Sequence, residues 1–164
     1  MKSIAAATLL LLAAAPTASQ AADLISVKQI SAELASDLAW EAVRACRAKG
    51  YQVSAVVVDR SASTQVVIRD TLAPRFTIQI AEEKANSVIL SKVSSSEFRK
   101  NREDIRMEMN HVDGLLVLEG GLPVTAGGSM VGAIGVSGAP GGEKDAECAL
   151  EALAKLEERL EFAD

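Results

Sequence analysis

The sequence predicts an α/β fold in which helices flank a five-stranded, mostly antiparallel sheet, with the element order αββααβββα. Apolar residues recur at helical spacing near both ends of the chain. Between them lie short β-rich runs that are separated by turn residues. Aromatic residues make up only 3% of a chain that is 49% hydrophobic, so the core must be aliphatic. Elements of these kinds bury their apolar sides when both terminal helices pack on one face of the sheet.

The first predicted helix runs from Ser26 to Lys49, with Ser26 as its N-cap and Gly50 in the left-handed position that ends it. Two β-rich runs follow, YQVSAVVVD at 51–59 and TQVVIR at 64–69. The four residues RSAS between them fit a hairpin turn, so these strands are expected to pair in antiparallel fashion.

Two helices are predicted in the middle of the chain. One begins at Pro74 or Thr77 and continues to about Ser91. The other begins at the capping box formed by Ser94 and Glu97, and its charged surface is either solvated or a lid over a ligand site.

Three short strands and a last helix complete the prediction. The strands are GLLVLEG at 114–120, GLPVTAGG at 121–128 and SMVGAIGVSG at 129–138, joined by Gly-Gly turns. Pro123 favours a short or edge position for the middle strand. The helix spans about 142–162, with acidic residues in its first turn.

The first 21 residues have the pattern of a secretory signal peptide. Lys2 precedes an apolar run from Ile4 to Ala15, and small residues at Ser19 and Ala21 suit a cleavage site. The run is too short to span a bilayer, and no later stretch is comparably apolar. We therefore expect a periplasmic or secreted protein, with residues 22–164 forming a single domain.

Composition argues against nucleic acid as a partner. The chain carries a net charge of −5, so it offers no basic field for phosphates, and it has few aromatic side chains for stacking on bases. The two cysteines, Cys46 and Cys148, fall in predicted helices, and the sequence leaves open whether they form a disulfide or stay free as small buried residues.

The glycine-rich stretch GAIGVSGAPGGEKDAE, residues 132–147, lies between a predicted strand and a helix, where many proteins bind phosphate. It matches neither the P-loop nor the dinucleotide fingerprint. Glu143 and Asp145 in the first helical turn would also repel an anion. The glycines are better explained by a tight connection, or by a bare strand at Gly135 and Gly138 that a flat ligand or a neighbouring subunit could approach.

Two charged residues and one histidine are the candidate ligand-binding groups. Arg69 ends a hairpin strand, and Lys84 lies on the helix that must contact the sheet, so both could hold an acidic group in one cleft. His111 is the only histidine and therefore the best candidate ligand for haem iron.

Several segments of the chain resemble the GlcG/HbpS family, small domains described as haem-binding or haem-degrading-like and also found as the C-terminal domain of PduO-type proteins. The resemblance rests on AVVVDR, VIRD, AEEKA and LLVLEGGLPVTAGGSMVGAIGVSGAPGGEKDAECA. It extends from the first predicted helix to the last, and it implies a five-stranded antiparallel sheet, homo-oligomers and a haem or tetrapyrrole ligand. Residues 69–76 read RDTLAPRF, so Arg75 occupies a position where relatives often have histidine.

The resemblance thus predicts an exported protein that binds a small ligand, haem or a related tetrapyrrole. Arg69, Arg75 and Lys84 would pair with acidic groups, and Gly135 and Gly138 would allow close backbone approach. Two other classes remain open: an enzyme acting on a small acidic metabolite, with Asp59 or Asp70 as general base, and a protein that modulates a partner at the cell surface.

Overall fold

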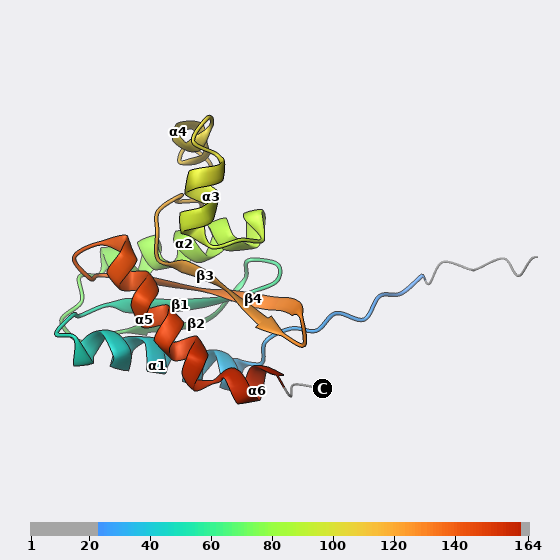
Figure 1. Cartoon of the computed structure of the whole chain (residues 1–164), viewed down its shortest axis with the longest axis horizontal. Coiled ribbons are helices and arrows are strands. Elements are labelled where there is room, and N and C mark those ends of the chain that lie inside the picture. Colours follow the sequence, from blue (N-terminus) through green and yellow to red (C-terminus); the bar gives the residue numbers. More distant parts are fainter. Residues whose placement is uncertain (1–22, 162–164) are drawn as a thin grey trace, which may run out of the picture.

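The computed structural model describes residues 23–161, so the predicted signal peptide lies outside the described residues. Ten elements form the domain (Figure 1). The strands are β1 (Ser54–Asp59), β2 (Thr64–Arg69), β3 (Gly121–Ala126) and β4 (Ser129–Ser137). The helices are α1 (Ala32–Ala48), α2 (Phe76–Ser91), α3 (Ser95–Asn101), α4 (Arg106–Met109), α5 (Gly142–Lys155) and α6 (Glu157–Glu161).

The sheet has four strands in the order β2-β1-β4-β3, and every neighbouring pair is antiparallel. This confirms the α/β class and the antiparallel sheet, but the predicted number of five strands is wrong. Residues 114–120 form no strand, because their backbone bonds elsewhere: Leu116 donates its N–H to the Glu83 carbonyl of α2. The helix order also differs, since both predicted helices that follow Ser91 and Gly141 are divided in two.

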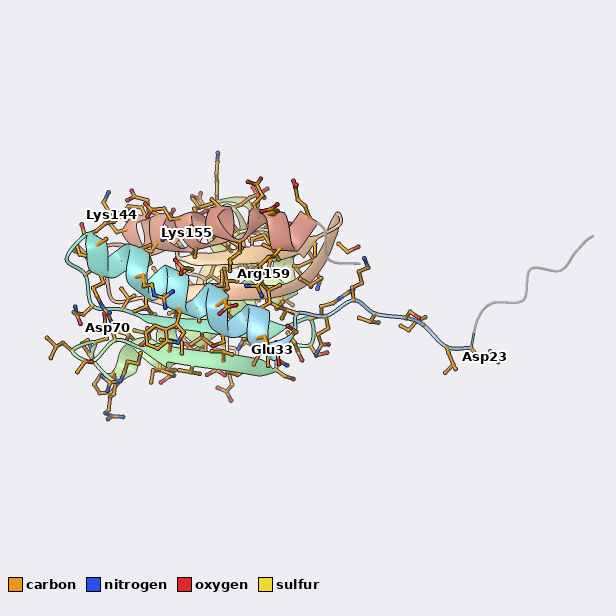
Figure 2. The ribbon with its side chains drawn as sticks, turned by 90° about the horizontal axis from the view of Figure 1, so that it is seen from below. Asp23, Glu33, Asp70, Lys144, Lys155 and Arg159 are labelled. Carbon is orange, nitrogen blue, oxygen red and sulfur yellow. A yellow bond between two sulfur atoms is a disulfide. The ribbon has the colours of Figure 1, made fainter. Side chains whose placement is uncertain are left out.

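Helices cover both faces of the sheet. The terminal helices α1 and α5 lie together on one face, as predicted, and α2 lies on the other (Figures 1 and 2). The two central strands are therefore covered on both sides, and every residue of β1 is buried. This explains why β1 reads as a continuous apolar run and not as an alternating one.

A disulfide joins the two terminal helices. Cys46 on α1 and Cys148 on α5 are bridged, with their Cα atoms 5.3 Å apart and a separation of 102 positions in sequence. Ion pairs between Lys155 and Glu41 and between Arg159 and Asp37 link the same layer at its surface. Of the two possibilities that the sequence left open for the cysteines, the structure has the bridged one.

The first helix starts later than predicted. Its N-cap is Ser31, whose side chain accepts a hydrogen bond from Leu34 N–H, and not Ser26. The preceding residue, Ile30, donates its N–H to the Val131 carbonyl at 3.1 Å, which holds this segment beside β4 in place of a helical turn. Within residues 23–161, no helix has both the length and the apolar character needed to cross a membrane.

Helix α2 packs directly on the backbone of β4, at Gly135, and of β3, at Gly121. A Cβ added at Gly135 would overlap the Ala81 carbonyl oxygen, and one at Gly121 would lie 2.5 Å from the Lys84 carbonyl oxygen. Both neighbours are backbone atoms that cannot move away without shifting the helix. The bare side of the strand is thus covered by α2 of the same chain.

We predict that Gly135→Ala lowers the free energy of unfolding by about 3 kcal/mol, because α2 would have to move off the sheet. Gly128→Ala is the control, since a Cβ there meets nothing and only the positive φ of +75° is strained, which costs about 1 kcal/mol. Urea denaturation of both variants measures the difference. Equal losses of stability in the two variants would show that the close approach of α2 to β4 is not needed for stability.

Candidate functional site

The candidate site is an apolar pocket of about 500 Å³ between the end of α2 and the helices α3 and α4. This volume falls within the range of small-molecule sites. In Figure 1, α3 and α4 stand away from the sheet on the side of α2, so the pocket lies outside the core. Its lining residues are Leu90, Ser91, Val93, Phe98, Asn101, Arg102, Ile105 and Met109.

A sharp turn after α2 creates the pocket. Lys92 adopts a left-handed conformation with φ of 65° and ends the helix, and its N–H bonds to the Val88 carbonyl. Ser94 then caps α3 by accepting a hydrogen bond from Glu97 N–H at 3.2 Å, as the capping box predicted. Phe98 is the buried anchor of α3, with only 8% of its surface exposed. The short helices thus form a wall facing the last turn of α2.

Arg102 is the cation at the pocket rim. Its guanidinium donates two hydrogen bonds to the Asp104 carboxylate, at 3.1 and 3.3 Å. These bonds hold the pKa of Asp104 below its usual range. Because both side chains are exposed, the pair contributes little to stability. The carboxylate of a ligand could therefore displace Asp104 from Arg102 with little loss of folding stability.

Two groups at the end of α4 could coordinate iron. Met109 lines the pocket, whereas His111, two residues later in an exposed turn, is not among the lining residues. The turn is held by His111 N–H, which donates to the Glu108 carbonyl, and by the Asn110 side chain, which accepts from Val117 N–H at 2.9 Å. Among residues 23–161, no group of three or more His, Cys, Asp or Glu side chains could hold a metal ion.

Arg69 and Arg75 lie in a different part of the molecule from the pocket. Arg69 ends β2 and Arg75 directly precedes α2, whereas the pocket adjoins the last residues of α2, about 24 Å away along a helix of this length. Arg69 donates to the Ala73 carbonyl at 2.6 Å, and the Arg75 guanidinium lies 4.2 Å from the ring centroid of the exposed Phe76. Their predicted role in ligand binding stays a prediction.

Lys84 does not point into an open cleft. Its side chain is 1% exposed and donates to the Asp145 carboxylate at 2.7 Å and to the Val136 carbonyl at 2.9 Å. Burial lowers the pKa of Lys84 and raises the pKa of Asp145, because desolvation disfavours both charges, while each charge stabilises the other. The pair joins α2 on one face of the sheet to α5 on the other.

The glycine-rich turn before α5 already holds an anion, the carboxylate of Asp145. This side chain accepts a hydrogen bond from Ala139 N–H at 3.0 Å besides its bond from Lys84. Gly138 has φ of +132°, and a Cβ there would lie 2.5 Å from the Gln52 carbonyl oxygen. Gly135 contacts α2, so neither glycine borders the pocket. Lys84, Gly135 and Gly138 thus contact other parts of the same chain, and their predicted role in ligand binding stays a prediction.

The two aspartates considered as general bases are engaged in the fold. Asp59 accepts hydrogen bonds from the N–H groups of Ser61 and Ser63, which shape the hairpin turn. Asp70 accepts two bonds from Arg47, at 3.0 and 2.8 Å, and these hold its pKa below the usual range. A base with a lowered pKa is a poor proton acceptor, so this geometry gives the enzyme hypothesis no support.

Sequence reasoning missed parts of both arrangements. Leu90, Val93 and Arg102 come from three separate segments that only the turn at Lys92 brings together. From the sequence, Asp145 is explained only by its favourable interaction with the helix dipole. The sequence nevertheless shows the two signals of the pair, an acid beside a glycine-rich turn and a lysine on an apolar helix face. Their 61-residue separation gave no local sign that they pair.

Comparison with known proteins identifies the fold family. The model of the family described as haem degrading protein HbpS-like matches residues 30–154. A search of curated protein sequences finds no match.

Solved structures agree with the family match. A crystal structure of Streptomyces reticuli HbpS with two Glu-to-Asp substitutions is 35% identical and has a TM-score of 0.77, covering 88% of this chain and 98% of that one. The Klebsiella pneumoniae protein ORFY is 25% identical with a TM-score of 0.76, covering 83% and 96%. A PduOC–haem complex, 21% identical with a TM-score of 0.66 and coverage of 77% and 94%, shares the fold.

We predict that Lys84→Met lowers the free energy of unfolding by about 3–5 kcal/mol, because it leaves the Asp145 carboxylate buried without its partner. The double variant Lys84→Met with Asp145→Leu should recover much of that loss. Lys155→Met, which breaks an exposed ion pair, is the control and should change stability little. Urea denaturation measures all three. A loss of stability in Lys84→Met as small as that in Lys155→Met would show that the buried pair is not needed for stability.

Proposed function

The chain belongs to the HbpS-like family of haem-degrading proteins, and from this premise we propose that it binds haem or a related tetrapyrrole in the pocket between α2, α3 and α4. The observation that carries the proposal is the pocket itself: apolar walls, about 500 Å³ of space and one cation at the rim. These are the features that a flat amphipathic ligand with acidic groups requires.

The residues present fit a tetrapyrrole at each of its chemical parts. Phe98 and Ile105 offer apolar surface for the macrocycle. Arg102 can donate paired N–H groups to a propionate once Asp104 is displaced. His111 supplies an imidazole at the end of α4, and Met109 a thioether in the pocket wall, both of which are haem-iron ligands in proteins.

The bound group would supply the iron chemistry, and the chain would supply binding and orientation. The pocket walls exclude water from one face of the ligand, and Arg102 sets which edge points outward. Because α3 and α4 follow the end of α2 in the chain, the position of this wall depends on how firmly α2 is held against the sheet. The geometry therefore favours a binding protein over an enzyme with its own acid and base groups.

Export and self-association belong to the same proposal. A disulfide between Cys46 and Cys148 persists in oxidising compartments, which supports the periplasmic or secreted location expected from the N-terminal sequence. The family resemblance supports a homo-oligomer.

We predict saturable binding when the purified protein is titrated with hemin and the Soret band is followed. Arg102→Ala should weaken binding roughly fivefold without moving the band, because it removes a propionate partner. His111→Ala should shift the band, because it removes the imidazole ligand. Arg159→Ala, an exposed arginine on α6, is the matched control and should behave as the parent.

Two results would contradict the proposal. One is the absence of saturable binding by the parent protein. The other is equal affinity in Arg102→Ala and Arg159→Ala, which would place the acidic groups of the ligand elsewhere.

A further inference from the structure

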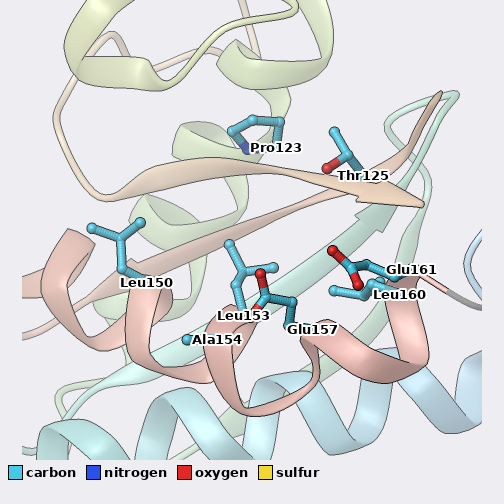
Figure 3. A pocket seen from close by; sticks show the side chains of 8 residues that line it. All are labelled: Pro123, Thr125, Leu150, Leu153, Ala154, Glu157, Leu160 and Glu161. Atoms are coloured by element: carbon cyan, nitrogen blue, oxygen red, sulfur yellow. The ribbon is translucent and has the colours of Figure 1, made fainter. Parts of the chain in front are cut away.

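The two edges of the sheet differ in what they offer to another strand. At the edge formed by β3, Gly121 N–H already donates to the Ser95 hydroxyl at 2.9 Å, and Pro123 has no N–H to donate. Leu150 and Leu153 of α5 line the same pocket as Pro123, beside this edge (Figure 3). The β3 edge is thus protected in the way that soluble proteins protect their outer strands.

The opposite edge is β2, and its ladder with β1 fixes which backbone groups point outward. Asp70 N–H, just after the strand, donates to the Val53 carbonyl at 2.9 Å. In an antiparallel ladder every second residue bonds to the neighbouring strand, and the residues between them point their N–H and C=O groups away from it. Val67 and Arg69 are therefore the residues of β2 with outward backbone groups.

The face of β2 on the side of α2 is poorly covered. Val66 and Ile68 pack against the core beneath α1, so Val67 between them points to the other face. Helix α2 lies over β1 and β4 and scarcely reaches β2. Val67 is consequently 41% exposed, although it is an aliphatic residue in the middle of a strand.

An aromatic ring and two arginines adjoin the end of this strand. Ser54 pairs with Arg69, and its hydroxyl lies 2.7 Å from that of Thr77, so the start of α2 lies at this end of β2. Phe76 there is 60% exposed, and the Arg75 guanidinium lies over its ring. The open edge is thus bordered by both apolar and cationic side chains.

Neither of these arginines forms an ion pair within the part of the chain that the structure describes. Arg69 donates to the Ala73 carbonyl at 2.6 Å, and Arg75 contacts the ring of Phe76. In a chain with a net charge of −5, two cations without carboxylates form a surface to which an acidic group is complementary.

We propose that β2 takes an extended, acidic segment of another protein as an added strand. The backbone of this segment bonds to the outward groups of Val67 and Arg69, the recognition mode known as β-strand addition. Opposite residues of an antiparallel pair share a face, so an aliphatic side chain of the partner contacts Val67, and a carboxylate two residues away meets the arginines. The irregularity in the ladder between Val57 and Val58 ends the regular edge toward the hairpin turn, so the contact is short.

The test is a titration of the full chain with the amidated, fluorescently labelled peptide TEVVTT, followed by fluorescence anisotropy. Its second and fourth residues lie opposite Arg69 and Val67. Binding should be saturable, and N-methylation of those two peptide residues should abolish it, because it removes two backbone donors and keeps the side chains. Val67→Pro removes a donor from the protein and should also abolish binding, since an edge strand tolerates proline where its N–H faces solvent.

Charge reversal tests the acidic character of the partner. Arg75→Glu should weaken binding of TEVVTT roughly fivefold and strengthen binding of the reversed peptide TKVVTT. Arg159→Glu is the matched control, because it changes the net charge equally on α6, which packs beside β3, and it should leave both affinities unchanged.

Three peptide results would overturn the proposal: no saturable binding by the parent, equal affinity for the N-methylated peptide, or equal affinities in Arg75→Glu and Arg159→Glu. A different occupant of the edge would also overturn it. A second copy of the chain would appear in light scattering as a lower molar mass of Val67→Pro. An anionic membrane would appear as sedimentation of the parent, but not of Arg75→Glu, with phosphatidylglycerol vesicles. None of these readouts involves haem, so the result is independent of the hemin titration.

Discussion

The buried ion pair between Lys84 and Asp145 is the interaction on which the rest of the structure depends. It connects the helical layers on opposite faces of the sheet, at the end of β4, where Val136 also accepts a bond from the same ammonium. Two charges can be buried together because each also has a backbone partner, the Val136 carbonyl for the ammonium and Ala139 N–H for the second carboxylate oxygen. The glycines around the pair follow from it, since a Cβ at Gly120 would lie 2.8 Å from the Lys84 ammonium nitrogen.

This arrangement separates a rigid scaffold from a protruding site. Gly135 lets α2 contact the backbone of β4, and the ion pair fixes the same helix to α5. The disulfide between Cys46 and Cys148 secures α5 to α1 on the far face. The wall formed by α3 and α4 stands outside this framework, and the apolar pocket opens beside it. A ligand can therefore bind against this wall without disturbing the core.

Local patterns predicted most of the fold, and contacts between distant segments account for the differences. The hairpin strand at 64–69, the cap at Ser94 and the start of the last helix at Gly142 depend on nearby residues and were confirmed. The strand predicted at 114–120 was wrong because Leu116 bonds to α2, a choice that its own apolar pattern does not reveal. Likewise, Lys84 had the properties of a ligand-binding cation until its distant partner was known. The pocket could not be predicted, since it depends on one left-handed residue, Lys92.

Hydrogen exchange measured by mass spectrometry, with and without hemin, tests the central claim most directly, because protection of backbone amides locates the ligand. The account predicts slower exchange across residues 90–111, which comprise the end of α2, the helices α3 and α4 and their flanking turns, and unchanged exchange in the arginine-containing segment at 69–76. Protection of 69–76 without any change at 90–111 would contradict it and would return the site to Arg69 and Arg75.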